Sequence, residues 1–295
     1  MSERTSRGRR LSARGLTILI VAACVVAYAV VVGLYAVNNQ TTRTDGCDIE
    51  PDPGQALLTI APQSMDAARD RLAVTIDVAS FGPAGSGSIA DEDLTLLLVG
   101  TDGPRTYSYE AGAIASPISA DVLTSGSIEA WPFDVHTADI AVALVRGDVT
   151  ADAETIPVLM CGTVHVPGWV FGSSPIDEAD EGVAAFTVET RRSAATVAFG
   201  IVLVGLMIVL PVLGITVAIT VLRGRRKVEA TLTSWMAAML FAIVPLRTYL
   251  PGSPPIGSWV DYTIVLWVVA GLVASLIIYV IAWLRWAPPG GAPAP

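Results

Sequence analysis

The feature that most limits how this chain can fold is a run of 29 residues, Ala194–Leu222, without a charged side chain. As one α-helix it would be about 43 Å long at about 1.5 Å per residue, more than the roughly 30 Å hydrocarbon core of a bilayer. Pro211 and Gly214 lie near its middle, where such a helix can bend. Four cations follow the run: Arg223, Arg225, Arg226 and Lys227. The positive-inside rule assigns such a cluster to the cytoplasm, so we predict a transmembrane helix over residues 194–222 and a cytoplasmic loop over residues 223–230.

Composition places one part of the chain in lipid and another in water. Of 295 residues 53% are hydrophobic, and the mean hydropathy of +0.59 is too high for one soluble domain. Residues 38–193 carry 24 acidic and 7 basic side chains, although the net charge of the whole chain is only −9. An acidic aqueous domain argues against a nucleic-acid partner, because phosphate binding needs clustered cations.

A second uncharged run, Leu16–Val37, follows a basic arm over residues 1–15. It is long enough to cross the bilayer once, and its basic flank predicts an uncleaved signal anchor whose amino terminus is cytoplasmic. Two alternatives stay open. Residues 21–24 resemble a bacterial lipobox, which would be cut before Cys24 and acylated there, and ordinary signal cleavage is the other. The run continues to Val37, however, whereas a signal peptide gives way to polar sequence near its cleavage site.

Residues 38–193 are polar and turn-rich, and we expect them to form a β-rich domain outside the cytoplasm. Seven short segments are rich in branched and aromatic residues and are bounded by Gly, Pro or Asp. They are Ala56–Ala61, Leu72–Val78, Leu94–Gly100, Thr106–Tyr109, Ile140–Val145, Ile156–Cys161 and Ala184–Thr190. Such segments predict an antiparallel β-sandwich-like domain. The fold class is therefore an α+β membrane protein with one transmembrane helix before this domain and three after it.

The three cysteines fit this arrangement. Cys24 lies in the first apolar run, whereas Cys47 and Cys161 lie in the aqueous domain, where the oxidising side of a membrane allows them to form a disulfide. In the chain-entropy model, closing a loop of this length stabilises a fold by about 4 to 5 kcal/mol. The sequence has no Cys-x-x-Cys pair, so we expect no metal or redox role for the cysteines.

Catalytic and metal-binding patterns are weak. His136 and His165 do not have the spacing of metal ligands, and together with Asp134 they are the only cluster that could serve an enzyme. The segment 85–87 is Gly-Ser-Gly, but Pro83 precedes it and no strand-turn-helix pattern surrounds it, so a flexible turn is favoured over a nucleophile elbow. We expect no enzymatic activity and no cofactor.

Two acidic clusters could in principle attract Ca²⁺, which favours several carboxylate oxygens. One spans residues 91–93 and the other residues 177–181. Neither has the pattern of a calcium-binding loop, so solvated acidic turns are favoured and no metal site is predicted.

One motif in the aqueous domain is sharper, Trp131-Pro132-Phe133-Asp134. Proline fixes φ, and Asp134 can accept hydrogen bonds from the turn that follows, so the motif predicts a rigid corner before a strand. The motif resembles the Phe-Pro-x-Asp loop of pentameric ligand-gated channels, which lies where their β-sandwich meets the membrane. Arg191 and Arg192, directly before a membrane helix, extend this parallel. The helix order departs from it, because those channels have no helix before the sandwich and four after it.

Two further apolar runs follow the basic loop. Thr231–Leu250 predicts a third span, residues 251–263 an outer loop, and Ile264–Leu284 a fourth span before a cytoplasmic tail rich in Pro, Gly and Ala over residues 285–295. We expect Arg247, near the outer end of the third span, either to reach the interface or to form a charge pair with Asp261. Four tryptophans fall near predicted interfaces, as in an aromatic belt: Trp235, Trp259, Trp283 and Trp286. Both termini are therefore expected in the cytoplasm.

Several blocks of the chain resemble one family. They are 210–214 (Leu-Pro-Val-Leu-Gly), 222–229, 244–247, 250–255 and 131–134. These blocks are similar to an uncharacterised family of actinobacterial, mycobacterial-type membrane proteins known only as a domain of unknown function. The resemblance extends from the first helix to the fourth. It implies a plasma-membrane location and no known activity, and it carries no catalytic residues over.

Two classes of function follow. The favoured prediction is an envelope scaffold or accessory subunit that binds a protein or an envelope component through its β-domain, while its helices pack against a membrane partner. Gly271 and Ser275 in the fourth span permit close helix packing. The alternative is a ligand-gated-channel-like sensor, a homo-oligomer in which the β-domain moves the second span through the corner at residues 131–134. The polar groups that this span could offer to a pore are Thr196, Thr216 and Thr220.

Overall fold

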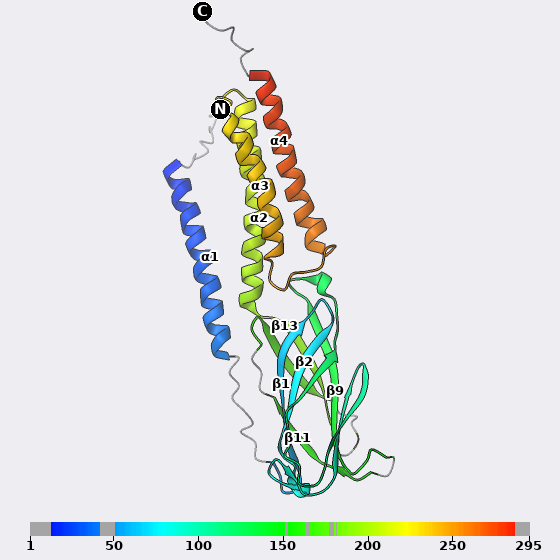
Figure 1. Cartoon of the computed structure of the whole chain (residues 1–295). Coiled ribbons are helices and arrows are strands. Elements are labelled where there is room, and N and C mark those ends of the chain that lie inside the picture. Colours follow the sequence, from blue (N-terminus) through cyan, green and yellow to red (C-terminus); the bar gives the residue numbers. More distant parts are fainter. Residues whose placement is uncertain are drawn as a thin grey trace, which may run out of the picture.

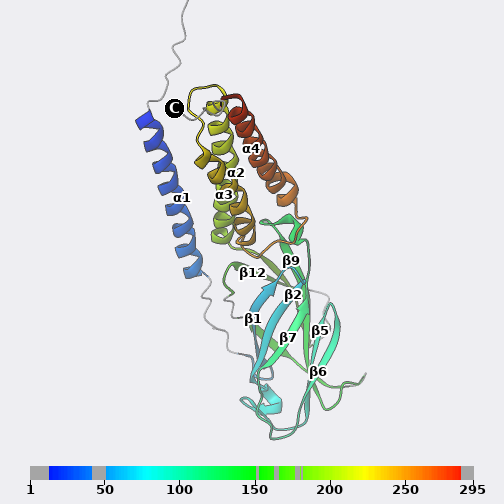
Figure 2. The same cartoon turned by 45° about the horizontal axis from the view of Figure 1, so that its top comes forward.

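The computed structural model describes residues 13–41, 51–150, 153–162, 166–176, 180 and 182–286. The chain forms a group of long helices with a β-domain at one end (Figure 1). A second view shows the same division, with α1 standing beside the bundle of α2, α3 and α4 (Figure 2). The loop between α3 and α4 meets the β-domain, whereas the loop between α2 and α3 lies at the opposite end of the bundle (Figure 1).

The helices are long and apolar. Their bounds are α1 Ala13–Thr41, α2 Ala194–Leu222, α3 Ala230–Thr248 and α4 Leu266–Trp286, with a π-helical turn, Asp261–Val265, before α4. Within the described residues, three helical segments have the length and composition to cross a membrane: 194–222, 231–248 and 261–286. In α1 a shorter apolar stretch was found, Val21–Val37. Helix α2 continues through Pro211 without interruption.

Two sheets make up most of the β-domain. In order across the sheet, the smaller contains β11 (Val158–Gly162), β1 (Ala56–Asp66), β2 (Arg71–Ser80) and β7 (Ile118–Leu123). The larger contains β12 (Trp169–Pro175), β13 (Ala184–Arg192), β9 (Val135–Arg146), β5 (Leu94–Gly100) and β6 (Gly103–Tyr109). Short strands β8 (Ser125–Gly126) and β10 (Thr155–Ile156) also pair with β9, and β3 (Gly85–Ser86) and β4 (Ile89–Ala90) form a hairpin. Single 3₁₀ turns are η1 (Gly82–Ala84) and η2 (Ile128–Ala130).

One apolar core lies between the two sheets. Successive side chains of a strand point to opposite faces, so the alternating pattern of β2 buries Leu72, Val74, Ile76 and Val78 together. Alternate residues of β5 and β9 meet them from the larger sheet: Leu94, Leu96, Leu98, Ile140, Val142 and Leu144. The two sheets therefore pack face to face around this core.

Strand pairing corrects the prediction at one edge. Strand β11 pairs with β1 in parallel, whereas an antiparallel domain was predicted. The chain changes sheets at Pro157, directly between β10 and β11, and this leaves β11 running in the direction of β1. Strands β7 and β12 were not predicted, and neither were the two-residue strands β3, β4 and β8. Strand β12 contains Gly172, two serines and Pro175, all poor strand formers, and it is tolerated because it lies at the edge of its sheet.

Small residues bring α2 and α4 close together. A Cβ atom added at Gly214 would lie 2.8 Å from Ser275 Oγ, and one at Gly271 would lie 3.0 Å from Pro211 Cβ. Ser275 is fully buried, and its hydroxyl donates a hydrogen bond to the Leu272 carbonyl. Close approach at these positions is the packing that small residues allow in membranes.

The predicted disulfide stays a prediction. Cys161 lies on β11, but Cys47 lies outside the described residues. Cys24 is an exposed free thiol on α1. Residues 1–12 and 287–295, which include most of the predicted basic arm and tail, also lie outside the described part of the chain.

Candidate functional site

The β-domain is fixed to the helices by a polar cluster that we call the joint. It consists of Trp131, Asp134 and His136 around the start of β9, Arg192 at the end of β13, and Pro251 in the loop between α3 and α4. The chain passes directly from Arg192 into α2, whose first turn is capped because the Ser193 hydroxyl accepts a hydrogen bond from the Thr196 amide. Two connections, one covalent and one through the loop, therefore converge on the joint.

A buried ion pair forms the centre of the joint. Arg192 donates from Nε to Asp134 Oδ1 at 2.5 Å and from Nη2 to Oδ2 at 2.9 Å. The two side chains are 2% and 0% exposed, respectively. The guanidinium also lies over the Trp169 ring, 4.7 Å from its centroid. A bidentate pair with this burial is strongly directional and fixes the end of β13 against the corner before β9.

His136 completes the buried network. Its Nε2 lies 3.2 Å from Asp134 Oδ2, its Nδ1 lies 3.6 Å from Asp70 Oδ1, and its side chain is fully buried. The ring stands edge-on to Trp169 at a centroid distance of 6.0 Å. A Cβ atom at Gly126 would lie 2.3 Å from His136 Nδ1, so only glycine fits beside the imidazole.

The loop between the last two helices reaches the joint through one carbonyl group. The Pro251 oxygen accepts hydrogen bonds from Trp131 Nε1 at 2.7 Å and from Arg192 Nη1 at 3.2 Å. In return, the Trp259 indole donates to the Trp131 carbonyl. Gly252 has a φ of +74°, and a Cβ atom there would lie 2.2 Å from Arg192 Nη1. Glycine is therefore required both by the backbone conformation and by the closeness of the guanidinium.

A second ion pair holds the same loop from the helix side. Arg247 donates from Nε to Asp261 Oδ1 at 3.1 Å and from Nη2 to Oδ2 at 2.9 Å. The guanidinium also donates to the carbonyls of Pro254 and Pro255, at 2.9 and 3.1 Å. The Gly257 amide donates to Asp261 Oδ2 at 2.9 Å. The structure thus brings Arg247 and Asp261 together, and the pair holds the loop from the helix side while Pro251 and Trp259 hold it at the joint.

Burial and hydrogen bonding act on the pKa of Asp134 in opposite directions. Desolvation, the largest single effect, raises the pKa, but the hydrogen bonds from His136 and Arg192 and the positive charge of Arg192 together outweigh it. The pKa of Asp134 therefore lies below its ordinary value of 3.8. The carboxyl group is ionised at neutral pH, as the bidentate pair requires.

The geometry gives the joint a structural role. Asp134 and His136 are in contact, but both side chains are fully buried, so a substrate cannot reach them. His165, the third residue of the candidate catalytic cluster, lies outside the described residues. Within the corner, Pro132 is buried but Phe133 is 65% exposed. Phe133 is therefore not part of the joint.

The acidic cluster over residues 91–93 does not converge on one point. Asp91 accepts a hydrogen bond from Ser86, Glu92 pairs with Arg146, and Asp93 accepts one from the Ala111 amide. Most of the cluster over residues 177–181 lies outside the described residues. Within the part of the chain that the structure describes, no three His, Cys, Asp or Glu side chains are grouped so as to hold a metal ion.

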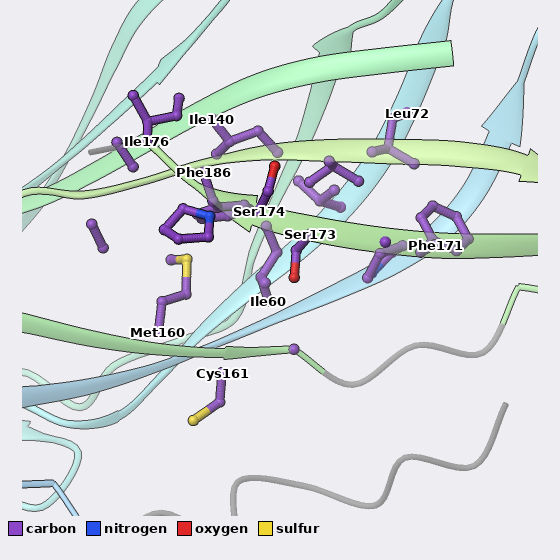
Figure 3. Close-up of a pocket in the computed structure, with 18 of the residues that line it drawn as sticks. Ile60, Leu72, Ile140, Met160, Cys161, Phe171, Ser173, Ser174, Ile176 and Phe186 are labelled. Carbon is purple, nitrogen blue, oxygen red and sulfur yellow. The ribbon is translucent and has the colours of Figure 1, made fainter. Parts of the chain in front are cut away.

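A cavity of about 480 Å³ opens between the two sheets, beside the edge strands β11 and β12. Its volume lies within the range of about 300 to 1,000 Å³ that is typical of small-molecule sites. Most of its wall is apolar (Figure 3), formed chiefly by Ile60, Leu72, Ile140, Met160, Phe171 and Phe186. The cavity extends from the core of the domain to the edge at which β11 and β12 do not pair with each other.

Small residues keep the mouth of the cavity open. Ser173 is paired with the inward-facing Val188, whereas Ser174 is paired with Thr187, whose hydroxyl bonds to Asp139 on the outer face. Directly paired residues share a face, so Ser173 points inward and Ser174 outward. Figure 3 shows the two hydroxyls on opposite sides of β12. A Cβ atom added at Gly162, at the end of β11, would have no atom closer than 3.9 Å.

Comparison with protein families divides the chain at the joint. Residues 48–190 match the family model DUF4436, and residues 192–286 match the family model DUF8686. Both are domains of unknown function. The resemblance to a family known only by such a description agrees with these two matches. The β-domain is thus similar to DUF4436 and the last three helices to DUF8686, and the matches meet beside Arg192. The sequence matches no curated protein.

Sequence reasoning found one half of the joint and missed the other. The sequence predicts the corner at Trp131–Asp134, but it places Arg192 only before a membrane helix and Pro251 only in an outer loop, and it predicts no role for Trp169. A lone acid in an aromatic corner and a pair of arginines directly before a membrane span are candidates for an ion pair. That pattern is the signal from which Arg192 could have been found.

Proposed function

We propose that this protein is a membrane-anchored binding protein, an accessory subunit of the cell envelope, whose β-domain holds the apolar chain of a lipid-like envelope component. The observation that carries the proposal is the cavity of about 480 Å³ between the two sheets. Its wall is made of aliphatic, aromatic and thioether groups that offer contact area and few hydrogen bonds. An acyl chain has the same properties, whereas a sugar or peptide would leave polar groups unpaired in the cavity.

The rim of the cavity suits a ligand with one polar end. Ser173 contributes a hydroxyl at the mouth, and the edge strands β11 and β12 border the opening. Backbone groups along a sheet edge can pair with a polar headgroup, while the chain lies between the sheets. This division of polar rim and apolar interior is typical of sites for amphiphiles.

The joint supports the accessory role. Because it connects β9, β13 and the α3–α4 loop through buried hydrogen bonds, it holds the cavity in one orientation relative to the helices. A scaffold that presents a bound envelope component to a membrane partner needs such a fixed orientation. We keep a membrane or envelope protein as the partner in this proposal.

The location that goes with this function is the plasma membrane of an actinobacterium, with α1 as a fourth span. Residues 38–193 would be extracytoplasmic, and both termini cytoplasmic. An oxidising outer compartment would pair Cys47 with Cys161. In a Cys24→Ala variant, we expect a maleimide to label no thiol in the denatured protein until a reductant is added. Labelling of both cysteines without reduction would contradict the pairing.

A matched pair of substitutions tests the cavity. Ser173→Phe places a ring inside the cavity, whereas Ser108→Phe places the same ring at an exposed position of β6 that does not line the cavity. Titrating a dansyl-labelled fatty acid into the purified full-length protein should give saturable binding. The affinity should fall about tenfold or more in Ser173→Phe, a loss of about 1.4 kcal/mol, and stay within about twofold in Ser108→Phe.

Two results would overturn the proposed cavity site. One is the absence of saturable binding to the unsubstituted protein. The other is an equal loss in the Ser173→Phe and Ser108→Phe variants, which would place the fatty acid elsewhere, on the helices or in the detergent. Gly162→Leu, which fills the cavity from β11, provides an independent check, because its position has room for the larger side chain.

The channel-like sensor has one observation in its favour, since α2 begins directly at the joint. The polar groups of α2 do not support it, because Thr216 and Thr220 donate their hydroxyl protons to carbonyls four residues earlier in the same helix. Native mass spectrometry after gentle extraction separates the two functions. A different protein in constant ratio would support the accessory subunit, and a symmetric homo-oligomer of several copies would favour the channel.

A further inference from the structure

A second hollow lies at the end of the helices far from the β-domain. It has a volume of about 610 Å³, and it is lined by residues 223–228 of the α2–α3 loop together with Trp283 and Trp286 of α4. Four of the loop residues are the exposed cations Arg223, Arg225, Arg226 and Lys227. We propose that this basic hollow binds the phosphate group of an anionic phospholipid.

The described part of the chain leaves the charge of the hollow without carboxylate partners. Within the described residues, none of the four cations forms an ion pair with a carboxylate. The backbone of Glu229, the nearest acid in sequence, is held by Tyr279, whose hydroxyl donates to the Glu229 carbonyl at 2.6 Å. The carboxyl ends of α2 and α4 each contribute about half a negative charge, and the amino end of α3 about half a positive charge. Four full positive charges outweigh these contributions.

The walls of the hollow are held in place. The Trp286 indole donates to the Leu222 carbonyl at 3.1 Å, which ties the end of α4 to the end of α2. The loop passes close beside the same ring, because Gly224 has a φ of +69° and a Cβ atom there would lie 3.5 Å from it. The Arg285 guanidinium lies over the ring, 5.4 Å from its centroid. These contacts give the hollow a defined shape, so it is more than a series of charged residues in the sequence.

Its position favours a lipid over a soluble phosphate compound. Tryptophan side chains favour the headgroup level of a bilayer, and Trp283 and Trp286 are each about half exposed at that level of the bundle. The adjoining surface of α4 exposes Ile281 and Leu284, against which acyl chains can lie. Basic pockets between membrane helices bind phospholipid headgroups by this combination of charge and apolar surface.

The test measures lipid binding to the purified full-length protein by native mass spectrometry, with phosphatidylglycerol, phosphatidylcholine and inorganic pyrophosphate as probes. We expect phosphatidylglycerol to bind at least about tenfold more tightly than phosphatidylcholine. Arg225→Gln/Arg226→Gln should weaken its binding by roughly thirtyfold, the equivalent of about 1 kcal/mol for each cation removed. Arg223, Lys227 and the amino-terminal arginines remain in this variant to orient the helices.

The matched control is Arg69→Gln/Arg71→Gln, which removes two exposed cations from the β-domain. It should leave phosphatidylglycerol binding unchanged. Trp286→Ala keeps every charge but removes a wall of the hollow, and it should weaken binding as well. Equal affinity for the two lipids, or an equal loss in the control, would overturn the proposal. Binding of pyrophosphate in preference to phosphatidylglycerol would also overturn it and assign the hollow to a soluble phosphate.

Discussion

Replacing Asp134 with asparagine is expected to lower the free energy of unfolding by about 3 to 5 kcal/mol, because the buried Arg192 guanidinium loses its countercharge. Asparagine has nearly the same shape as aspartate, so the loss reports the charge and not the packing. For a domain of about 150 residues this corresponds to a fall in Tm of roughly 6 to 20 °C. Thermal unfolding of the purified full-length protein, followed by tryptophan fluorescence, measures the change.

An exposed carboxyl group on β9, the strand that follows Asp134, supplies the control. Asp139 is exposed and accepts a hydrogen bond from Thr187 at 2.6 Å, so Asp139→Asn should cost no more than about 0.5 kcal/mol. The double variant Asp134→Leu/Arg192→Met should recover part of the loss, because it removes both buried charges together. If Asp134→Asn melts at the same temperature as Asp139→Asn, the buried pair does not stabilise the protein.

The same pair sets a dependence of stability on pH. Because the pKa of Asp134 is lowered in the folded state, the unfolded chain binds this proton more tightly than the folded protein does. The stabilisation is complete above the ordinary pKa of 3.8 and is lost as the pH falls through the lower pKa of the folded state. Between about pH 5 and pH 3, the Tm of the unsubstituted protein should therefore fall more steeply than that of Asp134→Asn.

Local sequence patterns predicted most of the helices and strands, but they did not predict how these elements pair and pack. An uncharged run of 29 residues followed by four cations can hardly form anything but a long apolar helix with a basic end, and α2 has those bounds. Alternation in residues 72–78 likewise predicted β2 and the face that it buries. Strand β12 was not predicted, because its own residues, among them Gly172 and Pro175, argue against a strand. Its stability comes from pairing with β13 at a sheet edge.

The joint shows why half of a site can be read from a sequence and the other half cannot. The Trp131–Asp134 motif is local, so its rigidity follows from residue types. Arg192 and Pro251 lie 58 and 117 positions beyond Asp134, and only the packing of β13 and of the α3–α4 loop brings them to it. Residue propensities do not predict the roles of Gly252 and Gly126, because each glycine leaves room for another residue's side chain.

Replacing Trp131 with alanine is the second change with a large expected effect, a loss of about 3 to 5 kcal/mol. Trp131 is 1% exposed, and a Cβ atom at Gly200 of α2 would lie 2.9 Å from its ring. The indole therefore fills the space between the β-domain and α2, and it donates to the Pro251 carbonyl at 2.7 Å. Trp131→Phe keeps much of the ring and loses the hydrogen bond, so it should cost about 1 kcal/mol beyond the smaller contact area.

Hydrogen exchange can separate a role in joining the two parts from an ordinary role in packing. If Trp131 couples the β-domain to the helices, Trp131→Ala should increase exchange in the loop over residues 249–261, because the Pro251 carbonyl loses the indole as its hydrogen-bond donor. Trp267→Ala removes a side chain that is 69% exposed on α4 and should leave that loop unchanged. Lower stability with unaltered exchange in the loop would show that Trp131 only fills space. Gly200→Leu should produce the same loosening from the helix side, because its side chain would occupy the position of the indole.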